Sequence, residues 1–385
     1  MPHPNFQMSI TSPADRSSPS AATADIPLSR TCVIRLERGL GGRGGRARKS
    51  GAGTHRIVYG AFMIRNAPAV RRDGLSHLAE RVRAHAGLHA KKPIGQVADV
   101  FGTTDWIAGP GDDGAAVAFD DAFVVACGEA LLPSFVANDP FGAGIAAVLT
   151  NINDLAAMGA RPIGIVDTIV ADEPTSREIL LGMRRGCELY DVPLLGGHLT
   201  RSDGPPALSA FGVGRAEAVL TMTNVAPGQA LLLGCAVQGE MRTDFPFFRG
   251  FDERGSRTAG DVRLLAELAE GGMCVAAKDV SMAGIIGSLA MLLEHGKWGV
   301  EVDLDVLPCP EGVALDQWLT CFPHFAFLMT GPVDRADDVR AAFHARDLEA
   351  ELIGTIDDTG SIRIASGGAT APVIDLSAEA ITGLR

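Results

Sequence analysis

Two adjacent carboxylates in a glycine-rich loop are the side chains of this 385-residue chain best suited to chemistry. Asp112 and Asp113 stand between Gly111 and Gly114, directly before a stretch that favours a β-strand. Adjacent carboxylates repel each other, but the pair becomes favourable when a hard divalent cation bridges its oxygens to a phosphate. The glycines let the backbone approach an anion closely and direct N–H groups at it. An exposed Asp-Gly hairpin turn is the alternative interpretation.

A second polar pair interrupts an apolar segment. Asn153 and Asp154 lie within residues 141–158, where apolar side chains recur every three or four positions, as on one face of a helix. Buried Asn and Asp in a helix are costly unless they find partners. Small residues follow at Ala156 and Ala157, which allow close helix packing and favour a polar flank that is not freely solvated. Capping of nearby backbone, or exposure to solvent, is the alternative.

A third pattern follows a short apolar stretch. Gly196 and Gly197 are two glycines after an expected strand, which is a common arrangement in phosphate-binding loops but a weak signal by itself. His198 and Thr200, just downstream, are candidates for contact with a phosphate or a substrate. A hydrogen-bonded structural role for His198 is the alternative.

The elements that position these residues alternate in type. The patterns predict helices at residues 72–82, 141–158, 176–190, 259–270, 283–295, 311–321 and 335–348. They predict strands at 115–119, 122–126, 163–170, 192–195, 207–214, 230–233, 274–277, 299–304, 325–330, 351–356 and 361–364, with a loop at 196–204. A linker turn at 224–228 separates two α/β units, so we expect domains over 72–223 and 224–385.

Charge is unevenly distributed along the chain. Residues 1–72 carry twelve basic and three acidic side chains, whereas the remainder carries 22 basic and 43 acidic ones. Residues 1–71 are rich in Ser, Pro, Gly and Arg and are expected to be a disordered extension, or the product of a start site placed upstream of the true one near Met63. An RNA-touching arm is the alternative. The acidic body argues against nucleic-acid binding and favours a cation that neutralises an anionic substrate.

The composition also indicates the cellular compartment. The seven cysteines are irregularly spaced and form no C-x-x-C pair, which is typical of reduced thiols. The sequence contains no run of eighteen apolar residues, so it predicts no transmembrane helix. The N-terminus lacks the compact apolar segment of a secretory signal. We therefore expect a cytoplasmic protein without a membrane partner.

Four motifs in a fixed order make a resemblance specific. They are Gly-Asp-Asp-Gly-Ala-Ala-Val from residue 111, Asn-Asp-Leu-Ala-Ala-Met-Gly-Ala-Arg-Pro from 153, Leu-Leu-Gly-Gly-His-Leu-Thr from 194, and Lys-Asp-Val-Ser-Met-Ala-Gly from 278. In this order they resemble the AIR synthase (PurM-like) superfamily over residues 72–375. That superfamily includes aminoimidazole ribonucleotide synthetase, thiamine-monophosphate kinase and selenophosphate synthetase, and the chain looks most like an AIR synthase-related branch distinct from these enzymes.

The resemblance implies a two-domain α/β (α+β) fold. Its N-terminal domain would carry a mixed sheet and dimerise by pairing sheets, and a C-terminal α/β domain would cover the cleft. ATP and Mg²⁺ are the implied cofactors, and a small molecule is the implied substrate. By position, the implied metal ligands are Asp112, Asp113, Asp154 and Glu129. The implied nucleotide- or substrate-binding residues are Gly111, Asp112, Asp113, Gly114, Asn153, Asp154, Gly196, Gly197, Thr200 and Asp279, and the implied catalytic residues are His198 and Asp154.

Departures from the superfamily pattern leave the reaction open. Many relatives have Thr-Asp where this chain has Gly128-Glu129, and Asp and Gly where it has Met282 and Ala283. Transfer of the ATP γ-phosphoryl group to a carbonyl or amide oxygen, for ligation or cyclisation, is the first expectation. A small-molecule kinase resembling thiamine-monophosphate kinase and a non-catalytic nucleotide-binding protein are the alternatives.

One further loop combines aromatic and basic side chains. Four phenylalanines and three arginines fall within twelve or so residues: Phe245, Phe247, Phe248, Phe251, Arg242, Arg249 and Arg254. The loop is expected to be either a mobile lid over a substrate or a satellite hydrophobic cluster between the domains.

Overall fold

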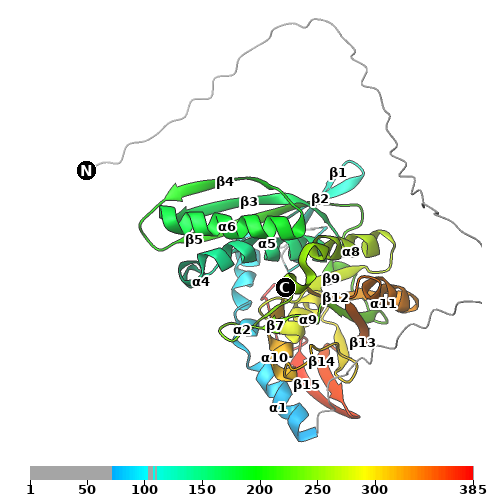
Figure 1. Ribbon diagram of the computed structural model, residues 1–385. Coiled ribbons are helices and arrows are strands. Elements are labelled where there is room, and N and C mark those ends of the chain that lie inside the picture. The colour runs from blue at the N-terminus through cyan, green and yellow to red at the C-terminus, as the bar shows by residue number, and fades with distance from the viewer. Residues whose placement is uncertain (1–71, 103–106, 109–110, 385) are drawn as a thin grey trace, which may run out of the picture. The chain divides into compact units, whose positions relative to one another are not determined.

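The computed structural model describes residues 72–102, 107–108 and 111–384 (Figure 1). The expectations for residues 1–71, which were disorder, a misplaced start or an RNA-binding arm, lie outside the described residues. Within them, no helix is both long enough and apolar enough to cross a bilayer.

The N-terminal half is built on a five-stranded sheet with strand order β1-β2-β5-β3-β4. Its strands are β1 (Ala115–Phe119), β2 (Ala122–Ala130), β3 (Arg161–Ala171), β4 (Leu194–Arg201) and β5 (Ala207–Ala216). Its helices are α4 (Pro133–Asn138), α5 (Pro140–Ala157) and α6 (Glu173–Tyr190). Helices α5 and α6 lie along one face of the sheet, as Figure 1 shows, and no helix of the described residues covers the opposite face, which is called the open face below.

Helix α5 is the element that positions the polar pair, and its ends are well defined. Asp139 caps the first turn, because its Oδ1 accepts the Gly142 N–H at 2.8 Å, and Pro140 occupies the first helical position. Gly159 follows the last turn with φ of +73°, a conformation that favours glycine. The helix is buried over most of its last three turns, which confirms the predicted segment 141–158.

The C-terminal half is built on a seven-stranded sheet with order β15-β14-β10-β13-β6-β12-β9. Its strands are β6 (Ala230–Cys235), β9 (Ala276–Asp279), β10 (Gly299–Asp303), β12 (Ala326–Gly331), β13 (Glu349–Asp357), β14 (Ser361–Ser366) and β15 (Ala369–Asp375). Its helices are α7 (Phe251–Arg254), α8 (Thr258–Glu270), α9 (Gly284–Glu294), α10 (Leu315–Thr320) and α11 (Ala336–His344). A small three-stranded sheet joins β7 (Glu240–Met241), β8 (Phe247–Arg249) and β11 (Phe322–Pro323).

The first described helix completes the C-terminal half. Helix α1 (Arg72–Arg83) packs on β14 and β15, and Figure 1 shows it beside β15. Its predicted apolar face is confirmed, since Leu75, Leu78 and Val82 are all buried. The Arg83 guanidinium donates to the Val373 carbonyl at 2.8 Å, which ties the helix to the last strand. The short segments α2 (Ala86–His89), η1 (Lys92–Gly95) and α3 (Gln96–Phe101) follow.

The predicted loop at 196–204 is wrong for most of its length, because β4 runs to Arg201. The two glycines suggested a turn, but Gly197 lies in the strand, where a Cβ would fall 1.4 Å from Asp167 Oδ1. Glycine is therefore required there by the neighbouring carboxylate of β3. Two further elements were not predicted: β15, which pairs with β14, and the small three-stranded sheet, whose strands β7 and β8 lie in a predicted loop.

Candidate nucleotide and metal site

Three carboxylates from separate segments converge where the two halves meet. Asp113 lies in the loop before β1, Asp154 on α5 and Asp279 at the end of β9. One oxygen from each lies within 4.8 Å of the other two. Asp154 and Asp279 are buried, and the Asp113 side chain is only 6 % exposed. The structure thus brings together two of the predicted metal ligands and the predicted cofactor-binding Asp279.

The acidic loop is fixed by its glycine and by the linker between the halves. Gly111 has φ of +108°, and a Cβ there would fall 2.5 Å from Met222 Cε. Asp112 Oδ1 accepts the Met222 N–H at 2.8 Å, and its Oδ2 accepts the Thr221 hydroxyl at 2.7 Å. Both oxygens of Asp112 therefore anchor the loop here, and a metal-binding role for Asp112 stays a prediction.

Lys278 is the cation of the cluster. Its ammonium forms an ion pair with Asp113 and lies 3.4 Å from the Gly111 carbonyl. The backbone N–H of Asp279 donates to Asp113 Oδ2 at 2.9 Å. Two successive residues of β9 in the C-terminal half thus hold one carboxylate of the N-terminal half.

The electrostatics of the cluster favour an added cation. Burial raises the pKa of Asp154 well above its ordinary range, and the nearby Asp279 and Asp113 raise it further. Burial also raises the pKa of Asp279 to about 8, with Asp113 adding to the effect and Lys278 opposing it. Burial alone would lower the pKa of Lys278, but the carboxylates of Asp113 and Asp279 outweigh it and raise that pKa. At neutral pH these raised pKa values favour the protonated forms of Asp154 and Asp279, and a divalent cation that binds the carboxylates would displace those protons.

The donor set fits Mg²⁺. All three groups offer hard carboxylate oxygens, and ligands about 2.1 Å from Mg²⁺ lie at most about 4.2 Å apart. The observed limit of 4.8 Å would shorten to that range with small side-chain rotations. Asp113, Asp154 and Asp279 would hold the ion.

Glu129 lies close to this group without joining it. Desolvation of its carboxyl group raises its pKa, Asp113 adds to the rise, and Lys91 and Lys278 oppose it, although the residue as a whole is exposed. Glu129 follows Gly128 near the end of β2 and is not one of the three converging carboxylates among the described residues. Its role as a metal ligand stays a prediction.

The two asparagines of α5 play different parts. Asn151 is fully buried and satisfied: its amide donates to the carbonyls of Ala147 and Ala210, and its Oδ1 accepts the Gly212 N–H at 2.9 Å. It clamps α5 to β5. Asn153 donates to the His324 carbonyl at 3.0 Å, but its buried Oδ1 has no hydrogen-bond partner among the described residues. Both ring nitrogens of His324 are likewise buried, and nothing in the described part of the chain forms a hydrogen bond to them.

The residues of the predicted phosphate loop lie elsewhere. Gly196, Gly197, His198 and Thr200 are exposed residues of the edge strand β4. His198 pairs with the exposed Thr168 of β3, so its side chain points to the open face of the sheet. Asp154 belongs to α5 on the opposite face. Within one chain, the structure does not bring His198 to the three carboxylates.

Two residues of the site, Lys278 and His324, were not predicted to have a role. Lys278 belongs to the fourth motif, and a lysine beside Asp279 in an apolar strand, which is fully buried here, was the signal that could have identified it. His324 had no such signal, because nothing in its local sequence distinguishes it from a structural histidine.

Two residues of the aromatic loop, Phe248 and Arg254, belong to the core. Phe248 packs on Trp318, and Arg254 forms an ion pair with Asp261.

The sequence matches two family domains in order. The AIR synthase related protein, N-terminal domain, covers residues 111–216, and the C-terminal domain covers residues 252–366. An uncharacterized protein of Synechocystis sp. is 35% identical over 278 residues, which span 71% of this chain and 86% of that protein. Phosphoribosylformylglycinamidine synthase subunit PurL of Methanosarcina barkeri is 26% identical over 308 residues, 72% of this chain but only 42% of PurL.

Solved structures share the fold. Thermotoga maritima PurL complexed with ADP superposes with a TM-score of 0.61 at 17% identity, covering 71% of this chain and 46% of PurL. AaThiL complexed with AMPPCP and TMP gives a TM-score of 0.56 at 16% identity, covering 73% of this chain and 96% of AaThiL. This chain spans less than half the length of these PurL proteins. The resemblance and the two-domain α/β fold are confirmed: the chain belongs to the AIR synthase related family, which includes enzymes such as PurL.

Proposed function

We propose that this protein is a magnesium- and ATP-dependent enzyme that transfers the γ-phosphoryl group to an oxygen of a small molecule. The observation that carries the proposal is the convergence of Asp113, Asp154 and Asp279 around Lys278. Such a group of buried carboxylates is costly without a cation. Nucleotides bound to the solved PurL and ThiL proteins support ATP as the ligand.

The chain's own residues would do three things in this reaction. The three carboxylates hold the cation, which supplies charge neutralisation and orientation of the phosphates. The Lys278 ammonium supplies a second positive charge beside the carboxylates. Once a cation has bound the carboxylates, this ammonium is free to form an ion pair with a phosphate oxygen of the nucleotide. Gly111 and Gly114 let the loop pack closely and so position Asp113, because a Cβ would fall 2.5 Å from Met222 Cε at Gly111 and 3.1 Å from the Ala126 carbonyl oxygen at Gly114.

We propose a carbonyl or amide oxygen as the acceptor. This oxygen attacks the γ-phosphorus, the bond between that phosphorus and the bridging oxygen breaks, and ADP leaves. A nitrogen nucleophile then attacks the activated carbon, and inorganic phosphate departs with the original oxygen. A kinase would stop after the first step, so recovery of a phosphorylated product rather than inorganic phosphate distinguishes the two reactions.

We further propose that two copies pair through the open face of the N-terminal sheet. Val117, Val124 and Phe211 expose 65 %, 38 % and 44 % of their surface on adjacent strands of that face. Exposed apolar patches of this kind mark interaction sites. His198 and Thr200 belong to the same face, so in this proposal they act within the paired sheets.

The binding part of the proposal is tested by calorimetric titration with AMPPCP, a non-hydrolysable ATP analogue. We expect binding to the wild type with Mg²⁺, much weaker binding without it, and loss of the Mg²⁺ dependence in Asp154→Asn. Asp121→Asn, on an exposed hairpin, is the matched control. Binding that is equal with and without Mg²⁺ in the wild type would exclude the carboxylate group as a metal site.

A further inference from the structure

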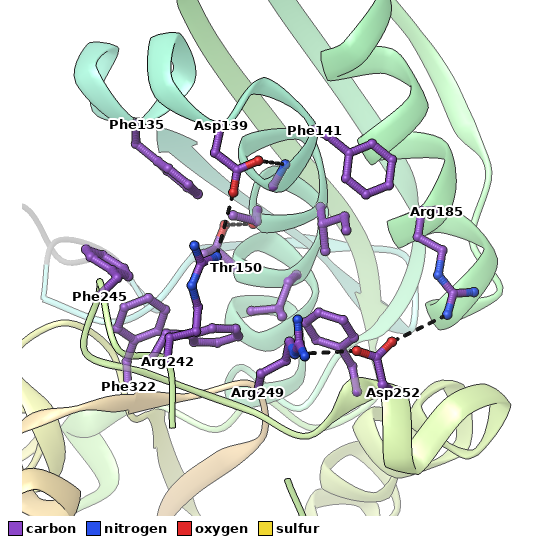
Figure 2. A pocket seen from close by; sticks show the side chains of 16 residues that line it. Phe135, Asp139, Phe141, Thr150, Arg185, Arg242, Phe245, Arg249, Asp252 and Phe322 are labelled. Atoms are coloured by element: carbon purple, nitrogen blue, oxygen red, sulfur yellow. Dashed lines mark hydrogen bonds and ion pairs between the residues drawn. The ribbon is translucent and has the colours of Figure 1, made fainter. Parts of the chain in front are cut away.

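A cavity of about 300 Å³ lies between α5 and the aromatic loop of the C-terminal half (Figure 2). Phenylalanines from both halves form its walls: Phe135, Phe141, Phe245, Phe247, Phe251 and Phe322. Phe135 stacks on Phe245 with centroids 6.1 Å apart, and Phe245 meets Phe322 edge-on at 5.3 Å. Five of the seven residues of the predicted lid or satellite cluster therefore line this space, and Phe248 and Arg254 do not.

The volume and the lining residues of the cavity indicate what kind of ligand it can hold. About 300 Å³ is the lower end of the range for small-molecule sites. Phenylalanine rings in stacked and edge-on arrangements offer favourable faces to a further planar ring. The space therefore suits a single aromatic or heteroaromatic ring with one small substituent.

Arginines from three segments stand at the cavity: Arg185 on α6, Arg242 after β7 and Arg249 on β8. Figure 2 shows Arg185 and Arg249 directed at the same carboxylate, Asp252. The Arg185–Asp252 ion pair is 3.9 Å long, which is beyond hydrogen-bond range. Arg185 can therefore turn to an anionic group of a ligand without breaking a hydrogen bond to Asp252.

One stripe of α5 connects the cavity to the carboxylates. Gly142, Ala146 and Thr150 line the cavity at intervals of four residues, and Asp154 is the next residue of that series. Residues four apart on a helix are neighbours, about 6 Å along the axis. A ligand seated along this stripe reaches towards Asp154.

Unpartnered polar atoms lie beside this path. Asn153 Oδ1 and both ring nitrogens of His324 are buried, and residues 72–102, 107–108 and 111–384 offer them no hydrogen-bond partner. His324 contacts the cavity-lining Phe251, with ring centroids 6.3 Å apart, and its carbonyl accepts from Asn153. Buried polar atoms are costly unless something hydrogen-bonds to them, and a ligand extending from the cavity would supply such a partner.

We propose that this cavity binds a small molecule with an aromatic or heteroaromatic ring and an anionic group, and that this molecule is the phosphoryl acceptor. Its ring lies among the phenylalanines, its anion meets Arg185, and its reactive oxygen faces Asp154. The assignment as acceptor rests on the proposed function. Binding itself does not, so it is tested without nucleotide.

The probe is phenyl phosphate, and benzyl alcohol is its neutral counterpart. Binding of each probe to the full chain is measured by saturation-transfer NMR. We expect phenyl phosphate to bind the wild type and benzyl alcohol to bind at least several-fold more weakly. Ala146→Phe fills the cavity and should abolish binding, while Ala341→Phe on the exposed side of α11 should leave it unchanged. Arg185→Gln should weaken phenyl phosphate several-fold but leave benzyl alcohol unaffected.

A second variant guards against loss of folding in Ala146→Phe. Phe141 is 40 % exposed, so Phe141→Ala removes one wall at low structural cost and should weaken phenyl phosphate several-fold. The probe should bind in the absence of ATP and Mg²⁺, which separates this site from the nucleotide site. Absence of wild-type binding, or binding to a folded Ala146→Phe as tight as to the wild type, would overturn the proposal. Equal affinity for the two probes would overturn its anionic part.

Discussion

The ammonium of Lys278 lies against the carboxylate of Asp113 and so joins the buried β9 of the C-terminal half to the acidic loop of the N-terminal half. Both side chains are 6 % exposed, so the pair is shielded from solvent. It holds together the two segments that supply Asp113 and Asp279, and therefore sets the geometry of the candidate metal site.

Lys278→Met should destabilise the metal-free protein by about 3–5 kcal/mol, because removing one partner leaves buried carboxylates uncompensated. Urea unfolding measures the change. Added Mg²⁺ should stabilise this variant more than the wild type, since no ammonium then competes for Asp113. Lys92→Met, at an exposed lysine, is the control. A loss below about 1 kcal/mol would show that Lys278 does not compensate the cluster.

His324 should make stability depend on pH. Burial, assisted by Arg254, lowers its pKa from 6.5 to about 3 in the folded protein. As pH falls below 6.5, the unfolded chain takes up a proton that the folded chain does not, so stability falls by up to about 1.4 kcal/mol per pH unit. Between pH 7.5 and 5.0, the wild type should therefore lose about 2 kcal/mol more than His324→Gln in urea unfolding. Parallel curves for the two proteins would contradict this.

Arg254 should matter for folding and not for ligand binding. It donates twice to the buried Asp261 and also to the carbonyls of Asp347 and Arg346. Arg254→Met should cost about 3–5 kcal/mol, because it leaves the Asp261 carboxylate buried without its partner. Arg257→Met, at a half-exposed arginine, should cost less than about 1 kcal/mol. Thermal unfolding of the two variants compares them directly.

The open face of the N-terminal sheet should govern association. We expect the wild type to sediment as a dimer and Phe211→Asp to sediment as a monomer, because a charge would be placed in the apolar centre of the pairing face. Asp substitution at the exposed Leu352, on β13 of the other half, is the control. A monomeric wild type, or a Phe211→Asp variant that still sediments as a dimer, would contradict the proposed pairing of the sheets.

The helices and most of the strands were predictable because their signals are local. The periodic apolar positions of α5 and the stop at Gly159 lie within one segment, and β1 was placed at its observed bounds. The β4 strand was mistaken for a loop because the reason for Gly197 is Asp167, thirty residues away and adjacent only in the folded sheet.

The site was predictable only in part for the same reason. Asp113 and Asp154 were identified from their residue types and surroundings, but their convergence with Asp279 depends on the packing of two separate sheets. Asp112 anchors its loop and is not one of the three converging carboxylates, because it accepts hydrogen bonds from Thr221 and Met222, which lie more than one hundred residues away in the sequence. The aromatic cavity likewise requires segments from both halves, so its loop could be read equally well as a lid or as a cluster.

The central claim is that Asp113 and Asp154 form a magnesium–nucleotide site. Thermal unfolding with ATP, with and without Mg²⁺, tests it most directly on the wild type, Asp112→Asn, Asp113→Asn and Asp154→Asn. We predict a rise in Tm for the wild type that requires Mg²⁺ and ATP together, and its loss in Asp113→Asn and Asp154→Asn. No rise in the wild type under any of these conditions, or an undiminished rise in both of those variants, would contradict the claim.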